Sequence, residues 1–350
     1  MPLFVSQPKM ENTLKNFYHG MVAQASIHGL LSSLLLPGSI AISILATMST
    51  AAAIVSQSSS TLAIATRLHL GYASHPPPTS QLKSSLRSFS MMASVAGARY
   101  AVVAVDAGPK LEGYDFVKEI QGICNEMNET CENDSADAPA AQGQVSIDVL
   151  PVTPWGKFVP ALNAIVGWSA RKGASYLMLA SAEVEITSGA VDVMKSHIMY
   201  SDDILVVGAA LQGHTHYAPH GGQEKEVNLD GRTTPWNTLA MWNLPKLALT
   251  GFLLVSDGLH PDEDGREGVG GVEEVCTIAT LQRILSKERA KAKLISIRPE
   301  SEGGKSVTWG QDFGGDEQRR EWHERKMRSK LTRAQLQLDL MGLSGKVIHC

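Results

Sequence analysis

The chain has 350 residues, enough for one large α/β domain or two smaller domains with buried cores. Hydrophobic residues make up 43% and charged residues 19%, values typical of a globular protein that exclude a collagen-like or wholly disordered chain. The 31 Lys and Arg residues are slightly outnumbered by 35 Asp and Glu residues, so we expect no nucleic-acid partner. The four cysteines form no CxxC pair, which disfavours a disulfide framework or a cysteine zinc motif.

Residues 1–95 differ in composition from the rest of the chain. No acidic residue occurs between Glu11 and Asp106, and Ser and Thr are frequent. This composition is typical of a transit peptide, which predicts a plastid or mitochondrial location. Alternatively, the apolar run within residues 29–56 is long enough to contact or span a membrane of the Golgi or endoplasmic reticulum.

A third alternative is that the product begins near Met91 or Met92. Under all three alternatives, residues 1–95 are a leader or anchor outside the fold. The predicted folded domain then covers residues 96–310, and residues 311–350 are predicted to form a charged surface helix.

From residue 99 onward, patterns of strand and helix alternate along the chain. Continuous apolar runs predict buried strands, and apolar residues three and four positions apart predict helices. The predicted strands cover residues 99–106, 145–152, 175–180 and 203–208. The predicted helices cover residues 114–127, about 161–170 and 188–200, with another carrying Ile278, Leu281, Ile284 and Leu285. This order predicts an α/β fold, with a mostly parallel, open, Rossmann-like sheet, helices on both faces and a ligand beyond the carboxyl ends of the strands.

The common phosphate-binding motifs are missing from the sequence. Neither GxxxxGK[ST] nor a GxGxxG after the first predicted strand is present, which disfavours a P-loop NTPase or a standard dinucleotide-binding domain. His214, His216 and His220 have a spacing that suits zinc, so a metal-dependent α/β hydrolase is one alternative function. Solvated loop histidines explain the same spacing.

The segment from Ala161 to Glu183 resembles the central unit of nucleotide-sugar-dependent glycosyltransferases of the GT-A fold. In that superfamily, the nucleotide-diphospho-sugar transferases, a helix rich in Ala, Asn and Gly precedes a strand that ends in a D-x-D motif. The resemblance covers roughly residues 98–290. It implies that Mg²⁺ or Mn²⁺ is held on the diphosphate by carboxylates. Here Ser181 and Glu183 stand at the two motif positions, so the first carboxylate is absent, and Glu183 with Glu185 is the implied metal pair.

The same resemblance implies roles for residues farther along the chain. The stretch 233–252 is similar to an acceptor-side loop, with Trp236 and Trp242 as sugar platforms or, alternatively, as core residues. Acids at the start of a helix imply that Glu273 or Glu274 is the general base for the acceptor hydroxyl, with Asp257 in reserve.

The helix N-terminus is expected to lower the pKa of such an acid. Alternatively, the two glutamates only complement the helix dipole.

Acids near the first strands of GT-A enzymes contact the nucleotide, which implies this role for Asp106 and Asp148. The sequence therefore predicts a glycosyltransferase that binds a nucleoside diphosphate sugar and transfers the sugar to a hydroxyl acceptor. The alternatives are a catalytically inactive binding or assembly protein with this fold, and the metal-dependent hydrolase.

Overall fold

The computed structural model describes residues 60–71, 75–108, 111–134, 145–217, 223–257, 271–297, 306–309 and 317–350. These residues belong to one compact unit that runs from Ser60 to Cys350.

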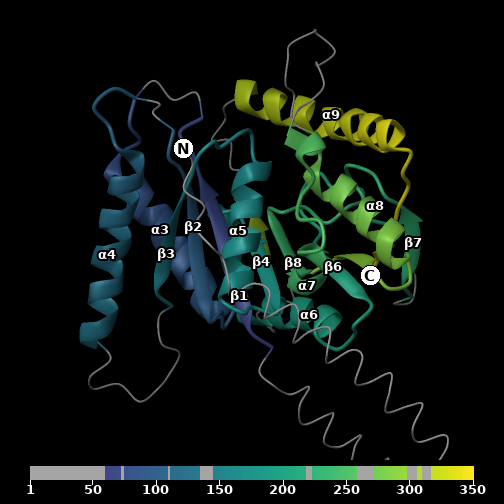
Figure 1. Ribbon diagram of the computed structural model, residues 1–350, viewed down its shortest axis with the longest axis horizontal. Helices are drawn as coiled ribbons and strands as arrows, with labels where there is room; N and C mark the ends of the chain where they lie inside the picture. Colours follow the sequence, from purple (N-terminus) through teal and green to yellow (C-terminus); the bar gives the residue numbers. More distant parts are fainter. Residues whose placement is uncertain are drawn as a thin grey trace, which may run out of the picture. The chain divides into compact units, whose positions relative to one another are not determined.

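A nine-stranded sheet forms the centre of this unit, in the order β3-β2-β1-β4-β8-β6-β9-β11-β7 (Figure 1). The strands of the sheet are β1 (Leu62–Leu68), β2 (Tyr100–Asp106), β3 (Ile147–Val152), β4 (Tyr176–Ala180), β6 (Ile204–Ala209), β7 (Lys225–Asn228), β8 (Leu239–Asn243), β9 (Lys291–Ile295) and β11 (Lys346–His349). Strand β8 runs antiparallel to β4 and β6, and β7 runs antiparallel to β11, whereas the other pairings are parallel. The predicted α/β class with a mostly parallel sheet is confirmed.

Helices cover both faces of the sheet. The helices are α3 (Thr79–Val95), α4 (Phe116–Asp134), α5 (Val159–Arg171), α6 (Ser188–Ile198), α7 (Leu244–Leu247), the 3-10 helix η2 (Leu254–Asp257), α8 (Glu273–Leu285) and α9 (Glu317–Met341). Helices α5, α7, α8 and α9 share one apolar core with the sheet, and α3, α4 and α6 share the other. Two short strands, β5 (Val184–Ile186) and β10 (Val307–Trp309), pair separately from the main sheet.

The prediction that residues 1–95 lie outside the fold is wrong for residues 62–95. Strand β1 lies between β2 and β4, and its residues Ala63, Ile64 and Ala65 are fully buried. Helix α3 buries Leu86 and Phe89 against the same sheet. A strand that is covered on both faces needs only a short apolar run. The seven-residue strand β1 contains such a run, although the segment around it is rich in Ser.

The expected membrane-contacting run within residues 29–56 lies outside the described residues, as does the remainder of the leader up to residue 59. No helix in the described part of the chain combines the length and apolarity that crossing a bilayer requires.

The C-terminal segment is also more than a surface helix. Helix α9 does lie on α8, as Figure 1 shows in yellow. The chain then returns to the sheet as β11, between β9 and β7. The predicted boundary at residue 311 therefore separates elements that share one core.

Candidate functional site at the carboxyl edge of the sheet

Three polar residues lie where strands β2, β1 and β4 end. Asp106 is the last residue of β2, Arg67 is the next-to-last residue of β1, and Ser181 directly follows β4. The registers align these ends, because Arg67 pairs with Ala104 and Ala65 pairs with Leu179. The three residues therefore occupy neighbouring positions along one edge of the sheet.

Strand alternation places these three residues on the same face. Ala65, Ala104 and Leu179 belong to the core that contains α5 and α8. Side chains two positions apart on a strand share a face, so Arg67, Asp106 and Ser181 are on the α8 side of the sheet. Asp106 is 3% exposed and its carboxylate accepts a hydrogen bond from the Gly108 N–H at 3.0 Å.

A short series of hydrogen bonds connects this edge to α8. The Ser181 N–H donates to the Thr238 carbonyl at 2.8 Å. The preceding residue, Asn237, donates its own N–H to Glu274 Oε1 at 2.6 Å. The D-x-D-like turn at Ser181 and the start of α8 are thus brought together by residues 237 and 238.

Trp242 of β8 holds Asn237 in this position. Its Nε1–H donates to Asn237 Oδ1 at 2.9 Å, and Asn237 Nδ2 is 3.4 Å from Glu273 Oε1. Trp242 is fully buried and contacts Phe252 edge to face. Of the two alternatives for Trp242, a sugar platform or a core residue, the structure agrees with the core residue, because the ring is enclosed in the core.

Glu274 is a buried carboxyl group with an unusual pKa. Burial, followed by the repulsion of Glu273, raises the pKa of Glu274 to about 7, although Lys330 and the Asn237 N–H act in the opposite direction. The sequence predicted a lowered pKa from the helix N-terminus. Desolvation outweighs that effect because Glu274 is only 4% exposed.

Helix α9 covers the two glutamates with positive and polar side chains. Arg333 and Lys330 both interact electrostatically with Glu274, and Arg333 also interacts with Glu273. Arg333 donates to the Gly271 carbonyl at 3.2 Å, and Gln337 accepts from the Val272 N–H at 3.1 Å. A Cβ at Gly271 would overlap the Gln337 amide and displace it from this position.

Of the two alternatives for Trp236, a sugar platform or a core residue, the structure agrees with the core residue. It is 1% exposed, and its Nε1–H donates to the Gly231 carbonyl at 2.9 Å. Its ring stacks on His214 with centroids 3.6 Å apart, and Lys330 Nζ lies 3.5 Å from its centroid. Both sides of the ring are therefore occupied.

The histidine pattern is not arranged as a zinc site in the described residues. His214 Nδ1 accepts from the Leu211 N–H at 2.8 Å, and Nε2 contacts the Thr234 carbonyl at 3.0 Å. Burial lowers the pKa of His214 to about 3, which keeps the ring neutral. His216 instead stacks on His349, and His220 lies outside the described residues.

Asp257 caps the helix that begins at the carboxyl edge. Its carboxylate accepts hydrogen bonds from the N–H groups of Lys157, Phe158 and Val159 at 2.7 to 2.9 Å. Val159 is the first residue of α5, and Lys157 and Phe158 lead into it, so Asp257 has a structural function in place of the reserve base role. Nearby, the buried Nε1–H of Trp155 has no hydrogen-bond partner among the described residues.

The remaining predicted site residues lie apart from this group. Asp148 is at the amino end of β3, opposite Val102, and forms an ion pair with Lys172 at 2.9 Å. It is therefore four residues, or roughly 13 Å, from the level of Asp106. Glu183 and Glu185 are exposed, and Glu185 lies opposite Thr308 in the small β5-β10 sheet.

The donors near Ser181 fit a divalent ion only together with a diphosphate. Glu183 is the carboxylate nearest to Ser181 in the chain, and its N–H donates to Ser181 Oγ at 3.4 Å. Mg²⁺ and Mn²⁺ are commonly held by one or two carboxylates plus substrate phosphates. Glu183 and Glu185 do not gather with a third His, Cys or acidic ligand within the part of the chain that is described.

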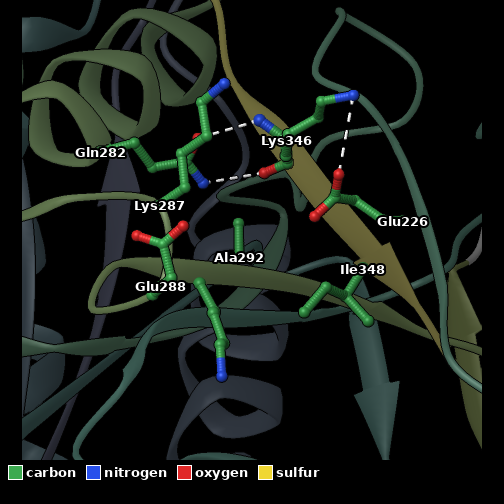
Figure 2. A pocket seen from close by; sticks show the side chains of 8 residues that line it. Glu226, Gln282, Lys287, Glu288, Ala292, Lys346 and Ile348 are labelled. Carbon is green, nitrogen blue, oxygen red and sulfur yellow. Dashed lines mark hydrogen bonds and ion pairs between the residues drawn. The ribbon is translucent and has the colours of Figure 1, made fainter.

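A surface pocket elsewhere on the sheet is unrelated to this edge. It is lined by residues of α8, β9, β11 and β7. Figure 2 shows the hydrogen bonds and the ion pair between its polar groups. Gln282 exchanges two hydrogen bonds with the backbone of Lys346, and Lys346 Nζ lies 3.6 Å from Glu226. These contacts anchor β11 and leave the pocket with mixed charge.

Sequence reasoning missed Arg67, Asn237, Lys330 and Arg333. Arg67 had the same signal as Asp106, since it is a charged residue at the end of an apolar run, but it lay in the segment assigned to a leader. Lys330 and Arg333 belong to a charged helix far along the chain. Nothing in the local sequence indicates that they meet Glu274.

Similarity to known proteins is found among solved structures. No protein-family model matches the chain, and no curated protein matches it. Solved structures similar to it include a mannosyltransferase from Pyrobaculum calidifontis in complex with GDP-Man and Mn²⁺, at 10% identity and a TM-score of 0.41, covering 79% of this chain and 66% of that one. Glucosyl-3-phosphoglycerate synthase of M. tuberculosis is similar at 10% identity and a TM-score of 0.39, covering 71% and 75%.

The chain is also similar to S. aureus TarS at 11% identity and a TM-score of 0.34, over 62% of this chain and 33% of that one. The chemistry proposed below rests on the residues of the carboxyl edge.

Proposed function

We propose that this chain binds a nucleoside diphosphate sugar at the carboxyl edge of the sheet and transfers the sugar to a hydroxyl acceptor. The observation that carries the proposal is Glu274, a buried carboxyl group with a pKa of about 7, tied by Asn237 to the turn at Ser181. A general base works best when its pKa is close to the working pH.

Different residues at the carboxyl edge of the sheet bind the nucleoside and the diphosphate. Asp106 accepts hydrogen bonds from the base or ribose of the nucleotide, and Arg67 balances the charge of the diphosphate. The Nε1–H of Trp155, which has no partner among the described residues, adds a donor, and the centroid of the Trp155 ring lies 5.8 Å from that of His69, which follows β1. A Mg²⁺ or Mn²⁺ ion held by Glu183 and the diphosphate would neutralise charge that builds up on the leaving group.

In the transfer itself, Glu274 accepts the proton of the acceptor hydroxyl. The hydroxyl oxygen forms a bond to the anomeric carbon, and the bond between that carbon and the diphosphate breaks. The electron pair leaves with the nucleoside diphosphate. Because Glu274 is 4% exposed, the acceptor reaches it only when covering side chains such as Lys330 move aside.

The first test measures the melting temperature of the full chain with UDP-, GDP- and CDP-sugars, with and without Mn²⁺. A bound ligand raises the melting temperature, so one nucleotide should produce a shift. Asp106→Asn and Arg67→Ala should reduce this shift. Asp148→Asn is the matched control, because this aspartate lies at the opposite end of its strand, and it should retain the shift. No shift with any nucleotide sugar would contradict the proposal.

A second test separates transfer from binding. Glu274→Gln should retain the nucleotide-dependent shift and lose turnover by about 10² to 10⁴-fold. A wild-type chain that binds one nucleotide sugar without turning it over would favour the non-catalytic alternative. That alternative is supported by Ser181 at the position of the first D-x-D acid.

A further inference from the structure

We propose that His197, Glu224 and Cys350 form a zinc site on the opposite face of the sheet. The three residues come from the last turn of α6, the residue preceding β7, and the residue following β11. One ligand atom from each of the three residues lies within 4.8 Å of the other two. Among the described residues, no other three His, Cys, Asp or Glu side chains come this close together.

The spacing of the donor atoms suits a tetrahedral ion. Zinc bonds of about 2.0 Å to nitrogen or oxygen and about 2.3 Å to sulfur place neighbouring ligand atoms roughly 3.2 to 3.7 Å apart. Cys350 Sγ and Glu224 Oε1 are already 3.7 Å apart. The remaining adjustment is about 1 Å or less, and Glu224 is an exposed side chain that can make it.

The types of ligand select zinc over the hard cations. A thiolate with an imidazole and a carboxylate is a typical zinc set, whereas Mg²⁺ and Mn²⁺ prefer oxygen alone. When the ion is bound, the thiolate and carboxylate contribute two negative charges. Lys293 contributes one positive charge, because its ammonium group contacts Glu224 Oε1, the same oxygen that lies nearest to Cys350 Sγ.

The backbone around Cys350 is fixed before any ion binds. Its N–H donates to the Leu294 carbonyl at 3.0 Å, and its carbonyl accepts from the Ser296 N–H at 3.0 Å. His216 Nε2 is 3.2 Å from the same carbonyl. The cysteine thus has a preset position, and zinc would fasten β11 to α6 and to the start of β7.

This site is independent of the proposed transferase function. Cys350 packs with the core of α3, α4 and α6, whereas Glu274 lies on α8 at the other face. Zinc binding can therefore be measured without a nucleotide sugar, and either result leaves the transferase proposal unchanged.

The experiment uses the full chain without a polyhistidine tag, stripped of metal and then dialysed against Zn²⁺ or Co²⁺. We expect one zinc ion per chain, a higher melting temperature with zinc, and a thiolate-to-cobalt charge-transfer band with Co²⁺. Cys350→Ser should abolish the band and weaken zinc binding at least 10-fold. His197→Gln should weaken zinc binding similarly and retain the thiolate band at higher cobalt concentration.

Two control variants make the result decisive. Cys124→Ser alters a buried cysteine of α4 that is remote in sequence from the three ligands, and it should bind zinc like the wild type. His216→Gln retains a donor for the Cys350 carbonyl and should also bind zinc. No zinc bound by the wild type, or zinc bound as tightly by Cys350→Ser as by the wild type, would overturn the proposal.

Discussion

Replacing Glu274 with Gln removes a buried proton-binding group and retains the oxygen that accepts the Asn237 N–H. Burial and Glu273 raise the pKa of Glu274 from its ordinary value of 4.5 to about 7. Between these two pH values the folded chain keeps a proton that the unfolded chain has already released. The free energy of unfolding contributed by this group therefore falls as the pH rises through the window.

The size of this effect follows from the two pKa values. One proton held only by the folded state changes the free energy of unfolding by about 1.4 kcal/mol per pH unit. Across the window from 4.5 to about 7, the wild type loses about 3 kcal/mol from Glu274. Glutamine does not titrate, so the stability of Glu274→Gln relative to the wild type should rise by about this amount between the two pH values.

Urea denaturation of the full chain at several pH values between about 4.5 and 8 measures this difference. The matched control is Glu112→Gln, which alters an exposed glutamate and should leave the pH dependence of the wild type unchanged. If Glu274→Gln and the wild type lost stability in parallel across the window, Glu274 would not carry the raised pKa, and its assignment as the base would fail.

Three further predictions concern the leader and the core. Asp257→Ala removes the acceptor of three backbone N–H groups at the start of α5 and should lower the free energy of unfolding by about 2 kcal/mol in urea, whereas Asp257→Asn should cost less. Trp236→Phe loses the bond to Gly231 and should cost about 1 kcal/mol while leaving the nucleotide-sugar response intact; a lost response at unchanged stability would restore the platform role. If the leader is removed in cells, mass spectrometry should find the new N-terminus at or before Leu62, because β1 lies between two other strands of the sheet. A mature chain that starts at Met91 would lack β1 and would contradict this fold.

The sequence predicted the regular part of the fold well. The apolar runs at 99–106 and 175–180 correspond to β2 and β4 within one residue at each end, because buried parallel strands are continuously apolar. Strand β1 was missed because its seven residues lie in a segment whose overall composition is typical of a leader. Strand β8 was missed because the stretch 233–252 was interpreted as an acceptor-side loop, and the burial of its residues depends on which strands pair with it.

The sequence could indicate a candidate site residue only where the position of that residue within its own strand or helix places it at the carboxyl edge. Asp106 ends a strand and Glu274 begins a helix, and both positions can be seen in the sequence. Asp148 shows the limit of this reasoning, because an acid at the start of a parallel strand faces the wrong edge of the sheet. The pKa of Glu274 is raised by burial and by Glu273 and is lowered by Lys330 of α9, and no local pattern encodes this burial or the contact with α9.

The position of β11 has a consequence for how the chain folds during synthesis. Strand β7 lies at one edge of the sheet and pairs with β11, which follows it in the chain by more than a hundred residues. The hydrogen bond from Lys346 Nζ to Asn228 Oδ1, for example, joins residues 118 positions apart. While the ribosome is still adding the intervening segment, β7 has no partner and β9 exposes an open edge. Such an edge attracts other strands until it is covered. Completion of the sheet therefore waits for residues 346–349 to emerge, and a stall shortly before them would leave a nearly finished domain ready to aggregate.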